Sequence, residues 1–125
     1  MKVNDAKILI CDDSKLVREE ISAIIKKAGT PEITFAKDGD EALAVIEGNR
    51  PDIIFLDICM PNTDGFDVLK QALNYKPMPH IVIVSSLGTK SAIMEALVCG
   101  AKDFIQKPFK DEQIINALEK ALKVL

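Results

Sequence analysis

Short apolar runs alternate along the chain with segments whose apolar residues recur every three or four positions. Three of these runs hold four apolar residues in succession, at 8–11, 53–56 and 81–84. A continuous run of this length is typical of a strand covered on both faces, as the central strands of a parallel sheet are. Two more mixed runs, Glu32–Ala36 and Asp103–Gln106, have the pattern of edge strands. The pattern therefore predicts five strands.

Each predicted strand is followed by a segment with helical spacing. The first has an apolar stripe from 17 to 28, with Ser14 as the expected N-cap and Gly29 just beyond its end. The second opens with the sequence Asp38–Glu41, which resembles a capping box, runs through Ile46 and is expected to stop at Gly48. The apolar positions of the other three helices are 68–73 after an N-cap at Asp64, 93–97 before Gly100, and 114–122.

The alternation of strand and helix predicts a (βα)5 chain of the α/β class. Parallel strands of one sheet need crossover connections, which are almost always right-handed. We expect a flavodoxin-like three-layer sandwich whose parallel strands lie in the order 2-1-3-4-5. The length of 125 residues fits one domain that spans residues 1–125. Because this fold has many functions, the function must be sought in its site.

Composition excludes several classes of function. Hydrophobic residues make up 48% of the chain and charged residues 28%, as in ordinary globular proteins. The net charge is −3 and there is no basic cluster, so direct binding to nucleic acid is not expected. No apolar run approaches the roughly 20 residues of a membrane span, and the N-terminus lacks a secretory signal. We expect a cytoplasmic protein without membrane insertion. Its three cysteines match no metal or disulfide framework and are expected to be reduced.

Chemically active side chains come where four of the predicted strands end. Asp12 and Asp13 follow the first strand, Asp57 follows the third, Ser85 ends the fourth and Lys107 follows the fifth. Ligands of open α/β sheets bind outside the carboxyl ends of the strands, near the point where the strand order reverses. Three carboxylates, a hydroxyl and an ammonium group are therefore expected to converge on one edge of the sheet.

The three carboxylates predict a metal site. Like charges held close together resist ionisation, and a hard divalent cation with a preference for oxygen ligands resolves this. Asp12 and Asp13 alone could equally cap the helix that follows them, which is a common role in such loops. The arrival of Asp57 at the same edge favours the metal. We expect Mg²⁺ as the cofactor, with Mn²⁺ as a substitute.

Lys107 and Ser85 each allow a second interpretation. A single lysine is usually a solvated surface residue, but one opposite three acids can balance their charge and bind a phosphoryl oxygen. The bond from Lys107 to Pro108 can be cis, which would turn the side chain inward. A serine at a strand end is often only a turn former. Beside the acids, however, the Ser85 hydroxyl can donate a hydrogen bond to a newly attached anionic group.

Four groups of landmark residues stand in a characteristic order and spacing: Asp12-Asp13, Asp57 with Met60-Pro61 and Gly65 after it, Ser85-Ser86, and Lys107-Pro108-Phe109. Together they resemble the receiver domain of bacterial two-component response regulators, and most of all the stand-alone CheY-like type. The resemblance covers the chain from about Lys7 to the last helix. It implies a phosphorylation-activated signalling switch, with chemotaxis as one setting. The domain would catalyse only its own phosphoryl transfer and dephosphorylation.

The resemblance also implies a role for each acid. Asp57 would accept a phosphoryl group from a sensor histidine kinase, and Lys107 would contact that group. Mg²⁺ would be held by Asp13, Asp57 and the backbone carbonyl of Cys59, with Asp12 acting through a metal-bound water. Cys59 lies at a position that tunes the lifetime of the acyl phosphate in this family.

Further implied roles concern the transmission of the signal. Ser85 would be the switch hydroxyl and Phe104 the aromatic switch residue, without the hydroxyl that a tyrosine would offer there. A downstream effector protein would bind the face formed by the fourth helix, the fifth strand and the fifth helix. Leu87 lies at a second lifetime-tuning position, and neither Leu87 nor Cys59 can orient water as well as an acid or amide.

Three alternative functions are compatible with parts of this pattern. A Mg²⁺-dependent phosphatase of the haloacid dehalogenase type also uses an aspartyl nucleophile, but it needs a second acid at the position of Cys59. A flavodoxin would need a phosphate-binding loop rich in glycine and hydroxyl groups, where this chain has Cys11–Ser14. A degenerate receiver that only binds other proteins would not be expected to keep every acid and the lysine.

Overall fold

The computed structural model describes residues 1–60 and 63–125, so Pro61 of the expected landmark lies outside the described residues. The strands are β1 (Lys7–Cys11), β2 (Glu32–Ala36), β3 (Ile53–Leu56), β4 (His80–Ser85) and β5 (Asp103–Gln106). The α-helices are α1 (Lys15–Lys26), α2 (Gly39–Asn49), α3 (Gly65–Ala72), α4 (Lys90–Val98) and α5 (Asp111–Val124), after a 3₁₀ turn at Val3–Asp5. The strands form one parallel sheet in the order β2-β1-β3-β4-β5, which confirms the predicted α/β fold.

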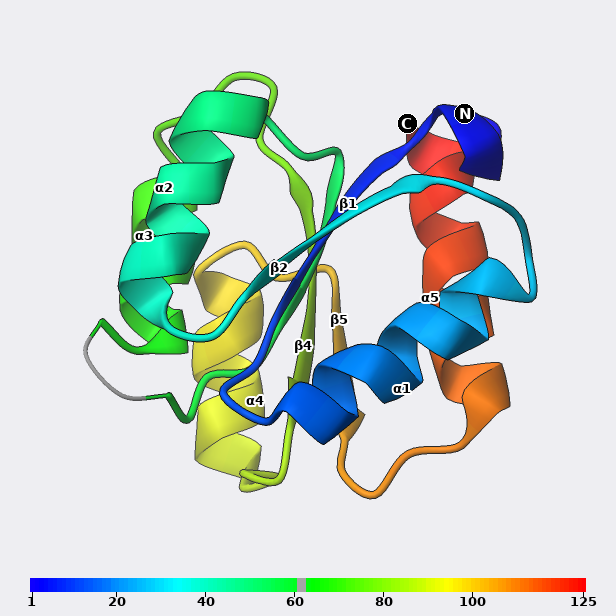
Figure 1. The fold of residues 1–125 in the computed structure, drawn as a ribbon. Coiled ribbons are helices and arrows are strands. Elements are labelled where there is room, and N and C mark those ends of the chain that lie inside the picture. The colour runs from blue at the N-terminus through cyan, green and yellow to red at the C-terminus, as the bar shows by residue number, and fades with distance from the viewer. Residues whose placement is uncertain (61–62) are drawn as a thin grey trace.

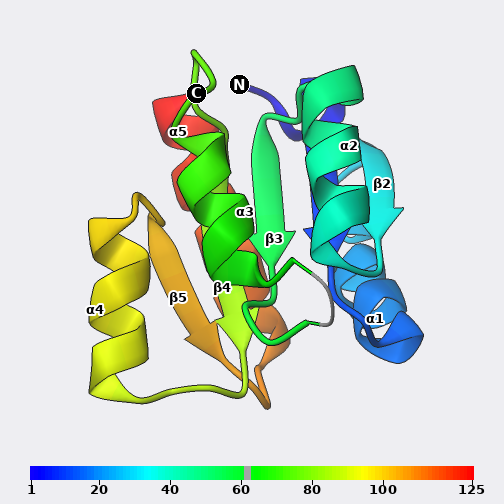
Figure 2. The ribbon, with the colours of Figure 1, turned by 90° about the vertical axis from the view of Figure 1, so that its left-hand side faces the viewer.

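The sheet lies between two layers of helices. Helices α1 and α5 cover one face, and α2, α3 and α4 cover the other (Figures 1 and 2). Every residue of β3 and β4 is buried, as the continuous apolar runs require. Successive residues of β3 alternate between the two faces: Ile54 and Leu56 pack in the core under α2–α4, whereas Ile53 and Phe55 pack in the core under α1 and α5.

The expected N-caps are present at three helices. The side chains of Ser14, Asp38 and Asp64 each accept a hydrogen bond from the backbone N–H three residues later. Thr89 caps α4 in the same way, at 3.1 Å from the N–H of Ala92. The Glu41 carboxylate accepts a hydrogen bond from the N–H of Lys37, the residue before the cap of α2.

The predicted end of α2 at Gly48 is wrong. The helix continues to Asn49, and Arg50 terminates it in the left-handed region with a φ of 48°. The cause is Pro51, since a proline disfavours the helical conformation for the residue before it. The Arg50 guanidinium group lies 4.4 Å from the centre of the Tyr75 ring, within the range of a cation–π contact.

Pairing between strands continues up to the residues that follow them. Cys11 and Leu56 are partners across β1 and β3, so Asp12 and Asp57 come next to each other at the edge of the sheet. The N–H of Asp57 donates to the carbonyl of Cys11 at 2.9 Å, and the N–H of Lys107 donates to the carbonyl of Ser85 at 2.9 Å. Backbone hydrogen bonds of the sheet therefore fix the main-chain positions of Asp57 and Lys107. Among the described helices, none is long and apolar enough to cross a membrane.

Candidate functional site

Three aspartates form one acidic cluster at the carboxyl edge of the sheet. Within the described residues, carboxylate oxygens of Asp12, Asp13 and Asp57 all lie within 4.8 Å of one another. Asp12 and Asp57 expose only 1% and 5% of their surface, whereas Asp13 is exposed. Burial raises the pKa of Asp12, and hydrogen bonds from Lys107 and from the N–H of Ser14 act in the opposite direction. The cluster is therefore buried at Asp12 and exposed to solvent at Asp13.

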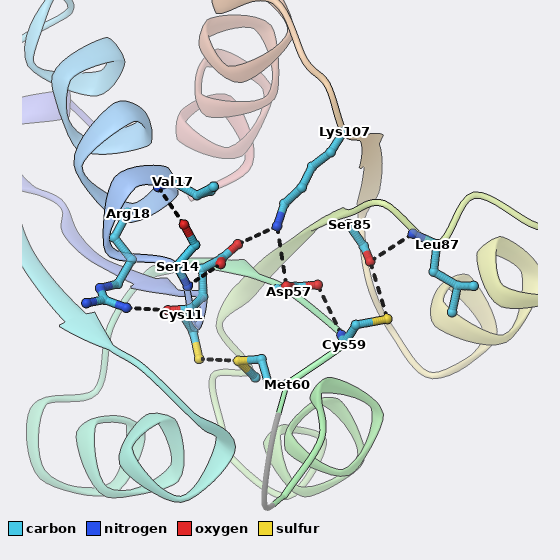
Figure 3. Close-up of polar contacts among 11 residues, drawn as sticks. Cys11, Ser14, Val17, Arg18, Asp57, Cys59, Met60, Ser85, Leu87 and Lys107 are labelled. Carbon is cyan, nitrogen blue, oxygen red and sulfur yellow. Dashed lines mark hydrogen bonds and ion pairs between the residues drawn. The ribbon is translucent and has the colours of Figure 1, made fainter.

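Lys107 supplies the positive charge of the site. Its Nζ lies 2.7 Å from Asp12 Oδ2 and 3.3 Å from Asp57 Oδ2, and Figure 3 shows the side chain reaching into the cluster. The peptide bond from Lys107 to Pro108 is cis. Burial alone would lower the pKa of Lys107, but the hydrogen bond to Asp12 and the charges of Asp57 and Asp12 outweigh it and raise this pKa. Lys107 is thus a cation at neutral pH.

The Asp57 carboxylate is held from two sides. Its Oδ1 accepts a hydrogen bond from the N–H of Cys59 at 3.0 Å, while its Oδ2 faces Lys107 (Figure 3). Gly65 explains how α3 can begin so close by, since a Cβ on Gly65 would overlap with the carbonyl of Asp57 and the Cα of Ile58. The glycine predicted as a landmark is therefore required by a close backbone approach.

Ser85 lies beside the acidic cluster at the end of β4. Its buried hydroxyl accepts a hydrogen bond from the N–H of Leu87 at 3.2 Å and lies 3.9 Å from Cys59 Sγ, to which it can donate. Figure 3 shows Ser85 and Cys59 on the side of Asp57 away from β1. The Cys59 and Leu87 side chains are exposed there. The Ser85 hydroxyl already has two partners within the chain.

Phe104 lies on the same face of the sheet as Ser85. It is the β5 partner of Ile83, two residues before Ser85 in β4, and it is partly buried against the core under α2–α4. Residues two apart in a strand share a face, and such diagonal neighbours lie within reach of an aromatic ring. Ser85 and Phe104 are therefore diagonal neighbours on the face of the sheet that α2, α3 and α4 cover.

Two neighbours of the cluster were missed in the sequence. Arg18 Nη1 donates to the carbonyl oxygen of Asp12 at 2.6 Å, so α1 itself holds the loop after β1 (Figure 3). A cation one turn inside the helix after two acids was the available signal. The second is Cys11, whose buried thiol lies 3.3 Å from Met60 Sδ and 3.6 Å from the carbonyl of Asp38. No sequence pattern indicated that contact, and all three cysteines of the chain are free.

The arrangement fits a hard divalent cation. Its donors are carboxylate oxygens, the ligands that Mg²⁺ prefers, and the exposed Asp13 leaves room for the waters that Mg²⁺ keeps. The neighbouring ammonium group offsets part of the negative charge without filling the exposed side. The site thus combines a positioned carboxylate, a set of oxygen ligands and a neighbouring ammonium group.

Comparison with known proteins identifies the family. A family model described as the response regulator receiver domain matches residues 8–119. The chain belongs to this family. It is 38% identical over 117 residues to the chemotaxis protein CheY of Listeria monocytogenes. The aligned region covers 94% of this chain and 98% of that protein. The chain is 37% identical, with the same coverage, to the chemotaxis protein CheY of Thermotoga maritima.

Solved structures of receiver domains have the same fold. The receiver domain of the Francisella response regulator 1452 is 32% identical and superposes with a TM-score of 0.86, covering 97% of this chain and all of that one. A CheY from Borrelia burgdorferi, solved in complex with CheX, BeF₃ and Mg²⁺, is 28% identical with a TM-score of 0.88, covering 94% of this chain and 89% of that one. This receiver domain is thus a homologue of CheY, a phosphorylation-activated switch. These matches give no support to the phosphatase alternative.

Proposed function

We propose that Asp57 is the phosphoacceptor of this receiver domain, that Mg²⁺ is required, and that a sensor histidine kinase is the donor. One observation carries the proposal: the nearly buried Asp57 carboxylate lies among two further aspartates and the Lys107 ammonium group. Because Cys59 N–H and Lys107 hold its two oxygens from different sides, the carboxylate has a fixed direction. Such positioning contributes much of the catalysis in phosphoryl transfer.

The acidic cluster supports a metal requirement. Asp13, Asp57 and the backbone carbonyl of Cys59 would hold Mg²⁺ directly, and Asp12 would act through a bound water. Mn²⁺ would substitute, since it also prefers carboxylate and water ligands. When bound, the cation would neutralise charge on the carboxylates and on the phosphoryl oxygens. The buried Asp12, tied to Lys107 and to the N–H of Ser14, would stay in place throughout.

The transfer itself asks little covalent chemistry of the chain. An Asp57 oxygen would form a bond to phosphorus while the bond from phosphorus to the donor's histidine nitrogen breaks, and the electron pair stays on that nitrogen. Lys107 would offset charge on the phosphoryl oxygens as a point charge. Water would later cleave the acyl phosphate, without help in orienting it from Cys59 or Leu87. The domain would catalyse only these two reactions of its own Asp57.

Ser85 and Phe104 would transmit the effect of phosphorylation from Asp57 to the output face. The Ser85 hydroxyl would exchange its contact with Cys59 for a phosphoryl oxygen, and the Phe104 ring would move into the space beside it. The output face would be α4, β5 and α5. On α4 the apolar side chains of Met94, Leu97 and Val98 are exposed, Val98 to 81%. A contiguous exposed apolar set of this kind favours a protein partner.

The relatives support a proposal for the setting of the switch. Since two CheY proteins align over nearly their whole length, we propose that residues 1–125 act as one receiver domain that signals to a separate effector protein, with chemotaxis as the favoured pathway. Direct binding to nucleic acid is not part of the proposal. We also propose that the exchange takes place in the cytoplasm, a location that the likeness to CheY supports.

The test is labelling by a small phosphodonor. Acetyl phosphate should label the wild-type protein in the presence of Mg²⁺ and not after chelation, and hydroxylamine should remove the label. Asp57→Asn should abolish labelling, whereas Asp67→Asn, at an exposed position of α3, should leave it unchanged. Stoichiometric labelling of the Asp57→Asn protein would contradict the proposal.

A further inference from the structure

The beginning of α2 is in direct contact with the loop that leads from β3 to α3. Gly39, the first residue of α2, is buried, and a Cβ at this position would overlap with the carbonyl of Thr63 and lie 2.7 Å from the Thr63 Cβ. The obstructing atoms belong largely to the backbone, so no side-chain rotation can relieve the overlap. A glycine at position 39 therefore allows the two segments to approach as closely as they do.

A hydrogen bond joins the same two segments. The Thr63 hydroxyl donates to Asp40 Oδ1 at 2.6 Å, from the loop to the first turn of α2. Asp40 and Thr63 are 23 positions apart in the chain, so this bond belongs to the tertiary structure and not to a local turn. A hydrogen bond to a charged acceptor is shorter and stronger than one between neutral groups. The close approach of Gly39 and this hydrogen bond both involve the same loop residue, Thr63.

Thr63 is connected to Asp57 through described residues. Gly65, two positions after Thr63, donates its N–H to the carbonyl of Ile58 at 3.3 Å and lies directly against the backbone of Asp57. A displacement of Thr63 therefore reaches the end of β3 through Gly65. The buried contact of Cys11 Sγ with Met60 Sδ, at 3.3 Å, holds the other side of the loop.

We infer that Gly39, Asp40 and Thr63 are positioning residues for the acidic cluster. The start of α2 holds Thr63 and, through Gly65, the residues directly after β3, where the N–H of Cys59 meets Asp57 Oδ1. The Cys59 carbonyl would be available to Mg²⁺ at the same place. None of these three residues is among those proposed to touch the metal or the phosphoryl group. The inference rests on the proposed function for its consequence at the metal, but the position of the loop can be measured without any metal.

Two matched pairs of variants test this inference. Gly48 lies in the same helix as Gly39, but a Cβ there would meet nothing within 4 Å, so Gly48→Ala is the control for Gly39→Ala. Thr63→Ser keeps the hydroxyl and is the control for Thr63→Val. In a Mg²⁺ titration followed by NMR, Gly39→Ala should raise the dissociation constant about tenfold, as the loss of an outer-shell partner does. Thr63→Val should raise it roughly threefold, the effect of one modest hydrogen bond.

The metal-free spectrum separates positioning from stability. In Gly39→Ala and Thr63→Val the amide signals of Asp57 and Cys59 should shift, and in Gly48→Ala and Thr63→Ser they should remain in place. If Gly39→Ala does not fold, the comparison of Thr63→Val with Thr63→Ser tests the inference alone. Wild-type signals for Asp57 and Cys59 in folded Thr63→Val would overturn the inference, as would equal Mg²⁺ affinities within both pairs. Failure of the wild-type protein to bind Mg²⁺ would count against the proposed function instead, and the metal-free shifts would still test the positioning.

Discussion

The Lys107 ammonium group is closer to Asp12 than to Asp57, with Nζ to Oδ2 distances of 2.7 Å and 3.3 Å. Asp12 exposes only 1% of its surface, so this shorter ion pair stabilises an almost completely buried carboxylate. Asp57 shares the lysine through a longer contact and keeps its second oxygen on the N–H of Cys59. A phosphoryl group on Asp57 would itself carry a charge of roughly −1.5 to −2 in place of the single charge of the carboxylate, and would attract Lys107 away from Asp12.

Lys107→Met removes the cation while keeping an unbranched side chain. Without Mg²⁺ the variant should lose about 1.5–3 kcal/mol of unfolding free energy at neutral pH, because hydrogen bonds to charged groups are lost. Its affinity for Mg²⁺ should rise, because no ammonium group competes for Asp12 and Asp57. Urea unfolding with and without Mg²⁺ measures both effects, and Lys70→Met, on the exposed surface of α3, is the control. An unchanged Mg²⁺ affinity would show that Lys107 does not compete with the metal.

Asp13→Asn should weaken Mg²⁺ binding more than Asp12→Asn does. Asp13 is the exposed member of the cluster and a proposed direct ligand, whereas Asp12 is proposed to act through water. We expect a loss of more than about tenfold for Asp13→Asn, since even outer-shell partners contribute that much. The chain has no Trp, so calorimetry or an NMR titration is the suitable measurement. If Asp12→Asn weakened Mg²⁺ binding more than Asp13→Asn, the roles assigned to these two aspartates would have to be exchanged.

Ser85→Ala should separate phosphorylation from switching. Labelling at Asp57 should continue, because Ser85 takes no part in the transfer. The phosphorylation-induced NMR shifts around Phe104 and residues 89–98 should become smaller, because the hydroxyl that would follow the phosphoryl group is missing. In a double-mutant cycle with Phe104→Leu, the two positions should couple by about 0.5–3 kcal/mol in the phosphorylated state. Full-sized shifts across α4 in labelled Ser85→Ala would remove Ser85 as the relay.

The fold followed from the sequence because its signals are local. Four apolar residues in succession need a strand buried on both faces, and β3 is fully buried as predicted. The two edge strands have the predicted bounds of Glu32–Ala36 and Asp103–Gln106. The end of α2 was misplaced because Gly48 is only a weak helix breaker, whereas Pro51, three residues later, constrains Arg50 directly.

The site was predictable only in its outline. Strand ends bring Asp12, Asp57 and Lys107 to one edge in any parallel sheet of this order, so their convergence could be expected. The preference of Lys107 for Asp12 could not, because it depends on how deeply each carboxylate is buried. The approach of Gly39 to Thr63 likewise depends on the packing of two segments far apart in the chain, for which no sequence periodicity exists.

His80 should make the stability of the protein pH-dependent. It is the chain's single histidine, exposes 8% of its surface at the start of β4, and has a pKa lowered by burial and by the charge of Lys102, with Asp103 opposing. As the pH falls below about 6.5, the unfolded chain takes up a proton that the folded chain resists, so stability decreases until the folded pKa is reached. Above about pH 6.5 His80 makes no such contribution.

The His80 prediction can be checked by urea unfolding between about pH 7.5 and pH 5.5. His80→Gln should remove part of the decrease in stability toward acid pH, and the imidazole signals of the wild-type protein should titrate below the ordinary histidine pKa. If the unfolding free energies of the two proteins changed in parallel with pH, the prediction for His80 would be wrong. A pKa of the wild-type imidazole above about 6.5 would also contradict it.

The central claim is that Asp57 is the phosphoacceptor in a Mg²⁺-dependent reaction. Its most direct test is to incubate the wild-type protein with acetyl phosphate and Mg²⁺, measure the intact mass, and locate the added group by fragmentation of the peptide that contains Asp57. We predict the mass increase of one phosphoryl group, placed on Asp57 and absent when Mg²⁺ is chelated. A phosphoryl group on Asp12, Asp13 or any other residue, or one that forms equally well without Mg²⁺, would contradict this account.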